Sequence, residues 1–555
     1  MSFLQRSHTL KLQSGKDKQE DLNPFDWYFA SLMAEINEVQ DHQIETLFAR
    51  LSHAINRQNS CLDLTQDIEL QNKLANLEYV TLINTDDVPK DPPISPLILW
   101  ANKLYLQKYY QYEANIARQL ISRNNFIKGF KPETLNLLFP SSDIEGKGAA
   151  VIDWQKVAAF QCLTRQLCII TGGPGTGKTS TVVKILAALV DQNPDLKIKL
   201  AAPTGKAAAR LSESIGTSLQ NLPSDLSSNI PTEVTTIHRL LGMRAEGQSF
   251  RYHSERRLSL DLLILDETSM IDLAMFDKIL KALPDHCRLI MLGDPDQLLS
   301  VESGAVMNDL FLLGQHYDDN YAHEIKSNLG YDIPKLSSEQ STEINILSNA
   351  FCHLTQSYRF NSTMGIGKLA SSIQNKMLTE LQSDDEILYV KEFTLPSLKI
   401  ALTGQYQSYI DLIEKNAEPS LLLAEFEKTR VLTPMREGEM GINSLNEIIE
   451  SSINKLKDHQ SFFHGKPIMI TRNDYNLGLF NGDIGICFST HLKEKKVIFR
   501  GAHGDVVTFP ISLLSGFETC FVMSIHKSQG SEFDNISVVL PSLQTSTNDL
   551  YTKEL

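Results

Sequence analysis

The chain has 555 residues, with a formal net charge of −15 and ordinary hydrophobic and charged fractions of 42% and 21%. This length predicts about three or four domains, and the acidic balance excludes a wholly basic nucleic-acid coat while leaving open a local cationic groove for a single strand. No apolar run is long enough to cross a bilayer, and the seven cysteines form no Cys-x-x-Cys pair, so we expect a cytoplasmic protein with reduced thiols and no membrane partner.

The first region carries no chemical motif and is predicted to be mostly helical. Asn23 is a typical helix start, and periodic apolar positions continue to Leu51. Residues 86–96 contain four prolines and predict a loop, whereas residues 97–121 begin like a strand and then become helical. A small, polar, charged joint follows, so we predict a mostly helical N-terminal domain at 1–145.

From Trp154 onward, short apolar runs alternate with helical stretches, as βαβ winding on a parallel sheet requires. The predicted strands are 167–170, 198–202, 260–265, 288–292 and, near the end, 536–540. A polar, strand-poor stretch at 313–340 predicts a surface insertion, and a second α/β region is expected from Asn349. We therefore predict an α/β fold with a first domain at 146–345, a second at 346–439 and 515–555, and a small β-barrel-like insert at 440–514.

An octet of the pattern G-x-x-x-x-G-K-[ST] follows the first of these strands and precedes a helical stretch. Its residues are Gly172, Gly173, Pro174, Gly175, Thr176, Gly177, Lys178 and Thr179. Such glycines let successive backbone N–H groups turn toward a phosphate, and the helix N-terminus adds positive potential. We expect Lys178 to reach the β- and γ-phosphates and Thr179 to hold Mg²⁺ through its hydroxyl. A chance glycine turn is a poor alternative in this context, so ATP and Mg²⁺ are the expected cofactors.

Two acidic motifs follow later strands of the same predicted sheet. Asp266 is expected to hold Mg²⁺ and Glu267 to polarise the attacking water, because both come directly after a buried strand. An acidic turn after a strand is common alone, but much less so downstream of a phosphate loop. Gln297 ends a Gly-Asp-Pro-Asp-Gln segment after the next strand and is expected to sense the γ-phosphate, although that segment is also a standard turn sequence.

Two further side chains are weaker candidates for the nucleotide site. Arg359, beside Tyr358, is a candidate arginine finger, because an arginine from a neighbouring domain can neutralise the charge that phosphoryl transfer builds. A Tyr-Arg pair on its own is more often an ordinary surface pair. Gln155 could bind an adenine edge, and an exposed helix glutamine is the alternative.

Hydroxyl, amide and basic groups at other strand ends suit the backbone phosphates of a nucleic-acid strand. The candidates are Pro203, Thr204, Lys206, Thr236, His238, His526 and Lys527, with Gly530 on the nucleotide side of the last segment. For Thr204 and Thr236, a helix cap is at least as good an interpretation. A lone histidine such as His526 is more often structural than catalytic.

In order along the chain, these motifs resemble those of superfamily 1 DNA helicases, and in detail those of the RecD family, the α subunit of exodeoxyribonuclease V (RecBCD). The segments that carry the resemblance are 172–179, 266–270, 293–298, 433–443, 472–483 and 526–533, with a weaker match at 104–113.

The resemblance implies two RecA-like domains with ATP in the cleft between them, single-stranded DNA across the top, and 5′→3′ helicase movement. It also implies RecB-like and RecC-like partner subunits, a duplex-end DNA substrate, and a role in double-strand break repair by homologous recombination and in DNA degradation. Nuclease chemistry belongs to RecB in that family, so no nuclease site is expected here. The domain at 1–145 is then a partner-interaction domain, and Asn473, in the segment 472–483, joins the DNA-binding candidates.

One departure from the family pattern concerns the last residues. The family continues beyond a segment like 551–555 into a further arginine motif, and losing such an arginine lowers the rate by about 10³-fold or more. Either the sequence is a fragment of a longer chain, or the product is an impaired motor, which leaves a second hypothesis open, an ATP-binding assembly subunit with impaired catalysis. A third is a stand-alone RecD-like helicase, against which the N-terminal region weighs because it lacks recognisable tandem hairpin repeats.

Overall fold

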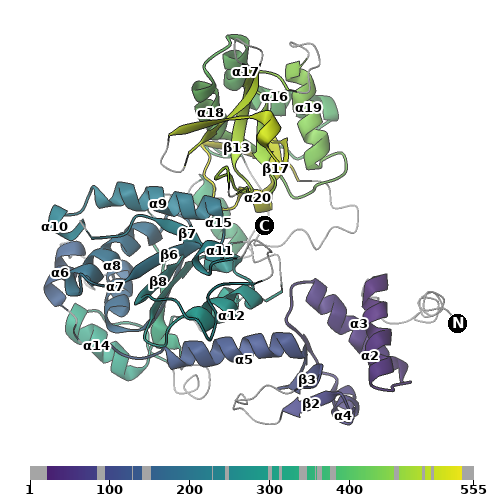
Figure 1. Ribbon diagram of the computed structural model, residues 1–555, viewed down its shortest axis with the longest axis vertical. Coiled ribbons are helices and arrows are strands. Elements are labelled where there is room, and N and C mark those ends of the chain that lie inside the picture. The colour runs from purple at the N-terminus through teal and green to yellow at the C-terminus, as the bar shows by residue number, and fades with distance from the viewer. Residues whose placement is uncertain are drawn as a thin grey trace.

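The computed structural model describes most of residues 22–540. The gaps are 84–93, 128, 130, 141–151, 228, 244–248, 298–302, 305, 312–314, 337–346, 357, 359–364, 375–382, 455–461, 475, 490–493 and 502–504. Figure 1 shows a small N-terminal unit, a large α/β body beside it and a second α/β body above. Within the described residues, no helix combines the length and the apolar character needed to cross a membrane.

The N-terminal unit begins at the predicted helix start. The side chain of Asn23 accepts from the Asp26 N–H at 3.0 Å, and the Asn23 N–H donates to Oδ2 of Asp26 at 3.0 Å, which is a capping box. The periodic stretch that continues to Leu51 is two packed helices, because the chain turns between them at Glu38, whose φ is 52°. A four-stranded sheet of order β1-β4-β3-β2 lies beside them and was not predicted as such. The elements of this unit are α2 (Pro24–Ile36), α3 (His42–Asn56), β1 (Cys61–Asp63), α4 (Ile68–Ala75), β2 (Val80–Ile83), β3 (Leu97–Trp100), β4 (Lys103–Leu106) and the start of α5 (Gln107–Ser122), whereas α6 (Pro132–Leu138) packs on the large body.

The large body is built on a six-stranded sheet of order β10-β5-β9-β8-β6-β7, and all its pairings are parallel. Its strands are β5 (Leu167–Gly172), β6 (Ile198–Ala202), β7 (Val234–Thr236), β8 (Leu262–Leu265), β9 (Arg288–Gly293) and β10 (Phe351–Leu354). Its helices are α7 (Trp154–Thr164), α8 (Lys178–Gln192), α9 (Gly205–Leu219), α10 (Ser224–Ser227), α11 (Ile237–Leu240), α12 (Leu273–Ala282), α13 (Val306–Phe311) and α14 (Asp319–Leu329). The four strands predicted here are confirmed. In addition β10, which the sequence assigned to the second region, pairs with β5.

Both faces of this sheet are buried, which explains the continuous apolar runs of its strands. Alternate residues of β5 enter two cores: Cys168 and Ile170 pack with α7, α8 and α14, whereas Leu167 and Ile169 pack with α5 and α12. The expectation of a surface insertion at 313–340 was wrong in part, because Tyr321 on α14 is buried in the first core.

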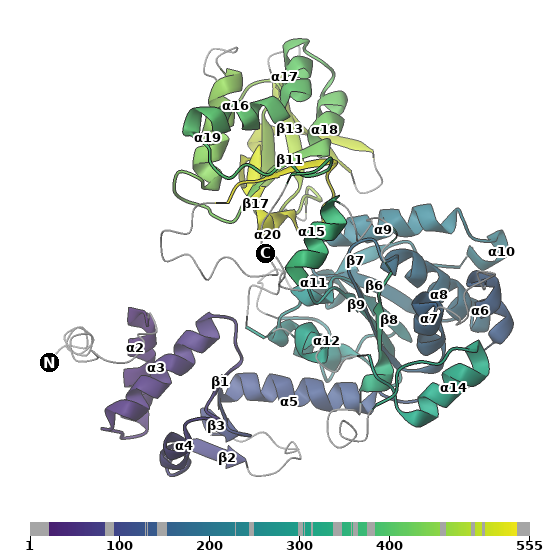
Figure 2. The ribbon, with the colours of Figure 1, turned by 180° about the vertical axis from the view of Figure 1, so that it is seen from behind.

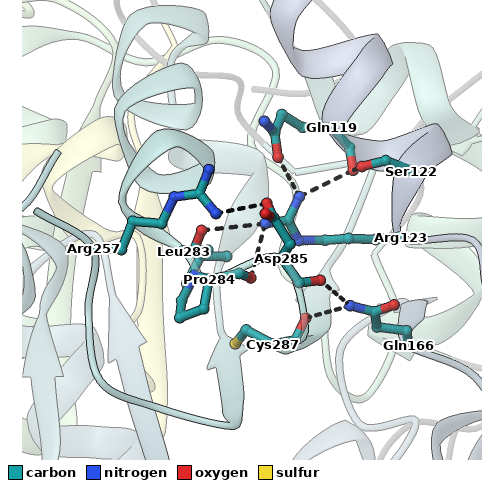
Figure 3. A network of polar contacts seen from close by, with 9 residues as sticks. All are labelled: Gln119, Ser122, Arg123, Gln166, Arg257, Leu283, Pro284, Asp285 and Cys287. Atoms are coloured by element: carbon teal, nitrogen blue, oxygen red, sulfur yellow. Dashed lines mark hydrogen bonds and ion pairs between the residues drawn. The ribbon is translucent and has the colours of Figure 1, made fainter. Parts of the chain in front are cut away.

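Helix α5 joins the N-terminal unit to the large body, and Figure 2 shows it running from the small sheet along the underside of the large body, below α12. Ile116 and Leu120 pack against the second core. At its C-terminal end Arg123 is 1% exposed, and its Nη2 donates to the carbonyl oxygens of Leu283 and Pro284 at 3.4 and 3.2 Å, as Figure 3 shows. This helix is therefore part of the large body's core as well as of the N-terminal unit.

The second body contains a three-stranded parallel sheet of order β17-β11-β18. Its elements are α16 (Leu395–Gln405), α17 (Gln407–Glu414), α18 (Pro419–Lys428), β11 (Thr429–Thr433), α19 (Ile442–Asn454), β17 (Val522–Ser524), α20 (Ile525–Ser528) and β18 (Asn535–Val538). Helix α15 (Gly365–Gln374) lies beside α11, between this body and the large one. The strand predicted at 536–540 is therefore present, but it starts one residue earlier and ends two residues earlier.

Between β11 and β17 the chain forms a five-stranded antiparallel sheet of order β15-β14-β13-β12-β16. Its strands are β12 (Pro467–Ile470), β13 (Ile484–Ser489), β14 (Lys495–Arg500), β15 (Val506–Pro510) and β16 (Phe517–Thr519). The predicted β-barrel is not confirmed: the edge strands β15 and β16 have no mutual pairing among the described residues. Short strands were also predicted from Met440 on, and there the structure has helix α19 instead.

Candidate nucleotide cleft and nucleic-acid interface

The phosphate loop connects β5 to α8 at the carboxyl edge of the parallel sheet. Gly177 has φ 80° in the left-handed region and is the residue at which α8 begins. This backbone conformation favours glycine, and a Cβ atom there would also meet Nε2 of Gln155 at 2.5 Å, so the glutamine would have to move. The loop thus presents the N-terminus of a 15-residue helix, an arrangement that favours a bound anion.

Lys178 and Gln155 both contact the backbone of this loop. Nζ of Lys178 donates to the carbonyl oxygens of Gly172 and Gly173, the second at 3.2 Å. Nε2 of Gln155 donates to the Thr176 carbonyl at 3.0 Å. Gln155 therefore lies beside the phosphate loop, and its predicted contact with a base stays a prediction.

Asp266 and Glu267 follow β8, as predicted. Glu267 has φ 50° and ψ 44°, a left-handed conformation that non-glycine residues rarely adopt and that is often found at functional sites. Burial, together with the adjacent Asp266 carboxylate, raises the pKa of Glu267 to about 7. Burial also raises the pKa of Asp266, while Lys178 and Arg210 oppose both shifts. A general base is most effective with a pKa near the working pH, so Glu267 suits proton transfer from water.

The segment after β9 is held by its own turn. Nε2 of Gln297 donates to Oδ2 of Asp294 at 3.2 Å, and the N–H of Asp296 donates to Oδ1 at 3.1 Å. Burial raises the pKa of Asp294, and Lys178 opposes that shift. The hydroxyl of Thr268 donates to the Leu292 carbonyl at 2.7 Å, which joins the two acidic motifs.

A cleft of about 820 Å³ collects most of the predicted nucleotide residues. Its lining includes Gly173, Pro174, Gly175, Thr176, Gly177, Lys178, Thr179, Asp266, Glu267 and Gln297 from the large body and Gly530 from the second body. Gly172 forms the base of the loop, where a Cβ atom would meet Oγ1 of Thr176 at 2.6 Å. Arg359 lies outside the described residues, as do residues 551–555, but the N–H of Tyr358 donates to the Gly175 carbonyl at 2.8 Å.

Sequence reasoning gave no role in this cleft to Arg210, Glu532 or Tyr358, which also line it. Arg210 on α9 forms an ion pair with Glu532, which follows α20 in the second body. Tyr358 was noted only as the neighbour of Arg359. A signal for Arg210 was present, because it follows Lys206 by four residues and so shares its helix face.

The threonines proposed to bind DNA act here as helix caps. Thr204 Oγ1 accepts from the Ala207 N–H at 3.1 Å to start α9, and Thr236 Oγ1 accepts from the Arg239 N–H at 3.3 Å to start α11. The alternative interpretation is thus confirmed for both, and it leaves DNA contact as a prediction. Pro203 lies directly before the first of these caps, at the end of β6.

The remaining DNA candidates come from both bodies. Burial, followed by the charge of Arg430, lowers the pKa of Lys206. A Cβ atom at Gly205 would meet the Phe480 ring at 2.6 Å, so the start of α9 touches the segment 472–483. In that segment Oδ1 of Asn473 accepts from the Asn481 N–H at 2.8 Å.

The other candidate side chains have partners of their own. Lys527 Nζ bonds Glu518 at 2.8 Å, next to His526 in α20, and the His238 ring lies 6.0 Å from that of Phe250. The structure therefore brings Lys206 and Asn473 to one junction between the bodies, with Lys527 and His238 on other elements.

Comparison with known proteins finds family models and relatives that agree with one another. Residues 18–88 match the family described as RecBCD enzyme subunit RecD, N-terminal domain, and residues 155–303 match the AAA domain family. RecBCD enzyme subunit RecD of Haemophilus influenzae is 36% identical, covering 83% of this chain and 75% of that protein. The subunit of the same name from Mycolicibacterium smegmatis is 32% identical, covering 97% and 91%. The ATP-dependent RecD2 DNA helicase of Deinococcus radiodurans is 27% identical, covering 68% and 44%.

Proposed function

This chain belongs to the RecD family of RecBCD enzyme subunits, and we propose that its cleft hydrolyses ATP to drive 5′→3′ movement along single-stranded DNA. The chain is an ATP-dependent DNA helicase subunit. It works with RecB-like and RecC-like subunits on duplex DNA ends, in double-strand break repair by homologous recombination and in DNA degradation. The residues 1–145 serve as its partner-interaction domain.

The observation that carries this proposal is the composition of the cleft. One cavity wall is the phosphate loop, the next holds Asp266 and Glu267, and the opposite wall comes from residues 525–532 of the second body. A nucleotide held between two bodies changes their separation when it is hydrolysed, which is how binding energy becomes movement.

Each residue of the cleft has a separate role in the proposed reaction. Lys178 leaves the loop carbonyls to meet the β- and γ-phosphates, and backbone N–H groups at the start of α8 hold the same charge. Glu267 orients the attacking water and accepts its proton, while Gln297 contacts the γ-phosphate from the neighbouring strand end. Arg359 supplies positive charge to the transferred group.

The donor set fits Mg²⁺ bound together with the nucleotide. Thr179 and Asp266 offer a hydroxyl and a carboxylate, both hard oxygen ligands, and no cluster of three or more metal-binding side chains occurs in the described part of the chain. Magnesium typically binds through one or two protein oxygens, substrate phosphates and water. Bound there by these two residues, it supplies charge neutralisation on the β- and γ-phosphates.

The proposal is tested by ATP hydrolysis with and without single-stranded DNA. We expect DNA to stimulate turnover and Lys178→Gln to abolish it, with binding of DNA retained. A rate that ignores DNA contradicts the helicase function. Binding of ATP without turnover, in a chain that still joins its partners, supports instead the assembly subunit with impaired catalysis.

Direction and partners are tested separately. Unwinding of duplexes with a 5′ single-stranded tail but not of those with a 3′ tail supports the proposed polarity. Co-purification of RecB-like and RecC-like subunits with the full chain supports the complex, whereas an active chain that purifies alone supports the stand-alone helicase.

A further inference from the structure

A second contact between the two bodies lies at the mouth of the nucleotide cleft. Arg210 projects from α9 of the large body and forms an ion pair with Glu532, four residues beyond the end of α20 in the second body. Both residues line the cleft that also contains the phosphate loop. The pair therefore spans the cleft between the bodies that form its two walls.

The same helix touches the second body again within one turn. Gly530 has φ 71°, and a Cβ atom at this position would lie 3.9 Å from Cβ of Ala207. Ala207 and Arg210 are three residues apart and so lie on one face of α9. That face of α9 therefore lies opposite the segment 530–532 of the second body.

The energetics point to a positional role for the pair. The side chains of Arg210 and Glu532 are 42% and 48% exposed, and exposed pairs of this kind contribute only about 0.2–1 kcal/mol to stability. The pair does little to hold either body folded. It instead joins α9 to residues 530–532 across the cleft that both residues line.

We propose that the Arg210–Glu532 ion pair, termed the cross-cleft pair, sets the nucleotide-binding width of the cleft, so that both are positioning residues for ATP. Its effect on turnover rests on the proposed function, whereas its effect on nucleotide binding does not. The competing role is direct contact of Arg210 with a phosphate. Reversal of both charges separates the two roles, because a glutamate at 210 can restore an ion pair but cannot bind a phosphate.

The test measures the Kd of a fluorescent ATP analogue, and DNA-stimulated turnover, for the full chain. Arg210→Glu and Glu532→Arg each leave like charges facing across the cleft, so we expect each to weaken analogue binding about tenfold, equivalent to about 1.4 kcal/mol. The double exchange is expected to return the Kd to within about threefold of the unmodified chain. Neutral variants Arg210→Gln and Glu532→Gln should give smaller losses in the same direction.

A matched control is available in the pair of Arg257 and Asp285. It is an exposed ion pair within the large body, with the side chains 38% and 79% exposed, and neither residue lines the cleft. Arg257→Glu is expected to leave the Kd unchanged. The proposal is overturned if the double exchange binds no better than the weaker single variant, or if both single variants bind normally. Analogue binding rescued by the exchange without any DNA-stimulated turnover supports the pair while contradicting the helicase function.

Discussion

The two ends of the six-stranded sheet have opposite electrostatic character. At the carboxyl end, Asp266, Glu267 and Asp294 are carboxylates whose pKa values burial raises, and Glu267 also adopts a left-handed backbone. At the amino end, a buried guanidinium group and a buried side-chain amide donate to backbone carbonyls, as Figure 3 shows. There Arg123 bonds the loop after α12, and Gln166 donates to the Asp285 and Cys287 carbonyls at 2.5 and 3.2 Å.

This difference separates catalysis from stability within one sheet. Crowded carboxylates destabilise the folded chain, and such groups persist where a ligand or a reaction uses them. The amino-end network fixes the starts of β5 and β9, which carry the phosphate loop and the Gln297 segment at their other ends. Changes at the carboxyl end should therefore alter activity, and changes at the amino end should alter stability.

The largest expected effect is loss of turnover in Glu267→Gln. Removing a general base lowers the rate by about 10²–10⁴-fold, because water is no longer deprotonated by the enzyme. The measurement is DNA-stimulated ATP hydrolysis, with analogue affinity as the control for an intact site. Turnover close to that of the unmodified chain would place the proton acceptor elsewhere and remove Glu267 from the proposed mechanism.

The sequence allowed much of this site to be predicted, because its signals are local. A continuous apolar strand followed by the glycine-rich octet specified the loop. Acidic residues directly after a later predicted strand specified Asp266 and Glu267, and a Gly-Asp-Pro-Asp turn after the following strand indicated Gln297. Pairing between strands that lie far apart in the sequence cannot be predicted from local signals, so β10 was assigned to the second region.

The other differences between the predicted and the observed structure also have physical causes. The N-terminal strands have only three or four residues, too few for a periodic signal, and Tyr321 is a buried side chain in a polar segment. The Arg210–Glu532 and Arg123 contacts depend on tertiary packing, which no spacing rule reports.

The second largest effect is expected at the amino end. Arg123→Met removes a buried charged donor from the carbonyls of Leu283 and Pro284, and we expect a loss of about 3 kcal/mol in the free energy of unfolding. Urea denaturation of the large body measures it, and the turnover number per folded molecule should stay within about twofold if the two ends are separable. A large fall in turnover per folded molecule, with no change in the free energy of unfolding, would contradict the separation of catalysis from stability.

A smaller effect concerns the stability of Glu267→Gln as a function of pH. The pKa of Glu267 is about 7 in the folded chain, above its ordinary value of 4.5, so the folded chain holds this proton at pH values where the unfolded chain has released it. The contribution of Glu267 to the free energy of unfolding therefore falls as pH rises between these values and stays low above them. Without nucleotide or Mg²⁺, Glu267→Gln should unfold at higher temperature than the unmodified chain at pH 8, with a difference that shrinks toward pH 5. Equal midpoints at both pH values would mean that Glu267 is not destabilised by its surroundings.

The smallest effect is expected for Arg257→Gln, in the same amino-end network as Arg123. Arg257 pairs with Asp285 at 2.7 Å, but the two side chains are 38% and 79% exposed, so water and salt screen the pair. We expect the free energy of unfolding to change by less than about 0.5 kcal/mol, and 1 M NaCl to remove even that difference. The two arginines differ in burial while sharing one loop, so urea denaturation of both variants isolates what burial contributes. A loss in Arg257→Gln equal to that in Arg123→Met would show that the exposed ion pair, and not the buried bonds to carbonyls, holds the amino end together.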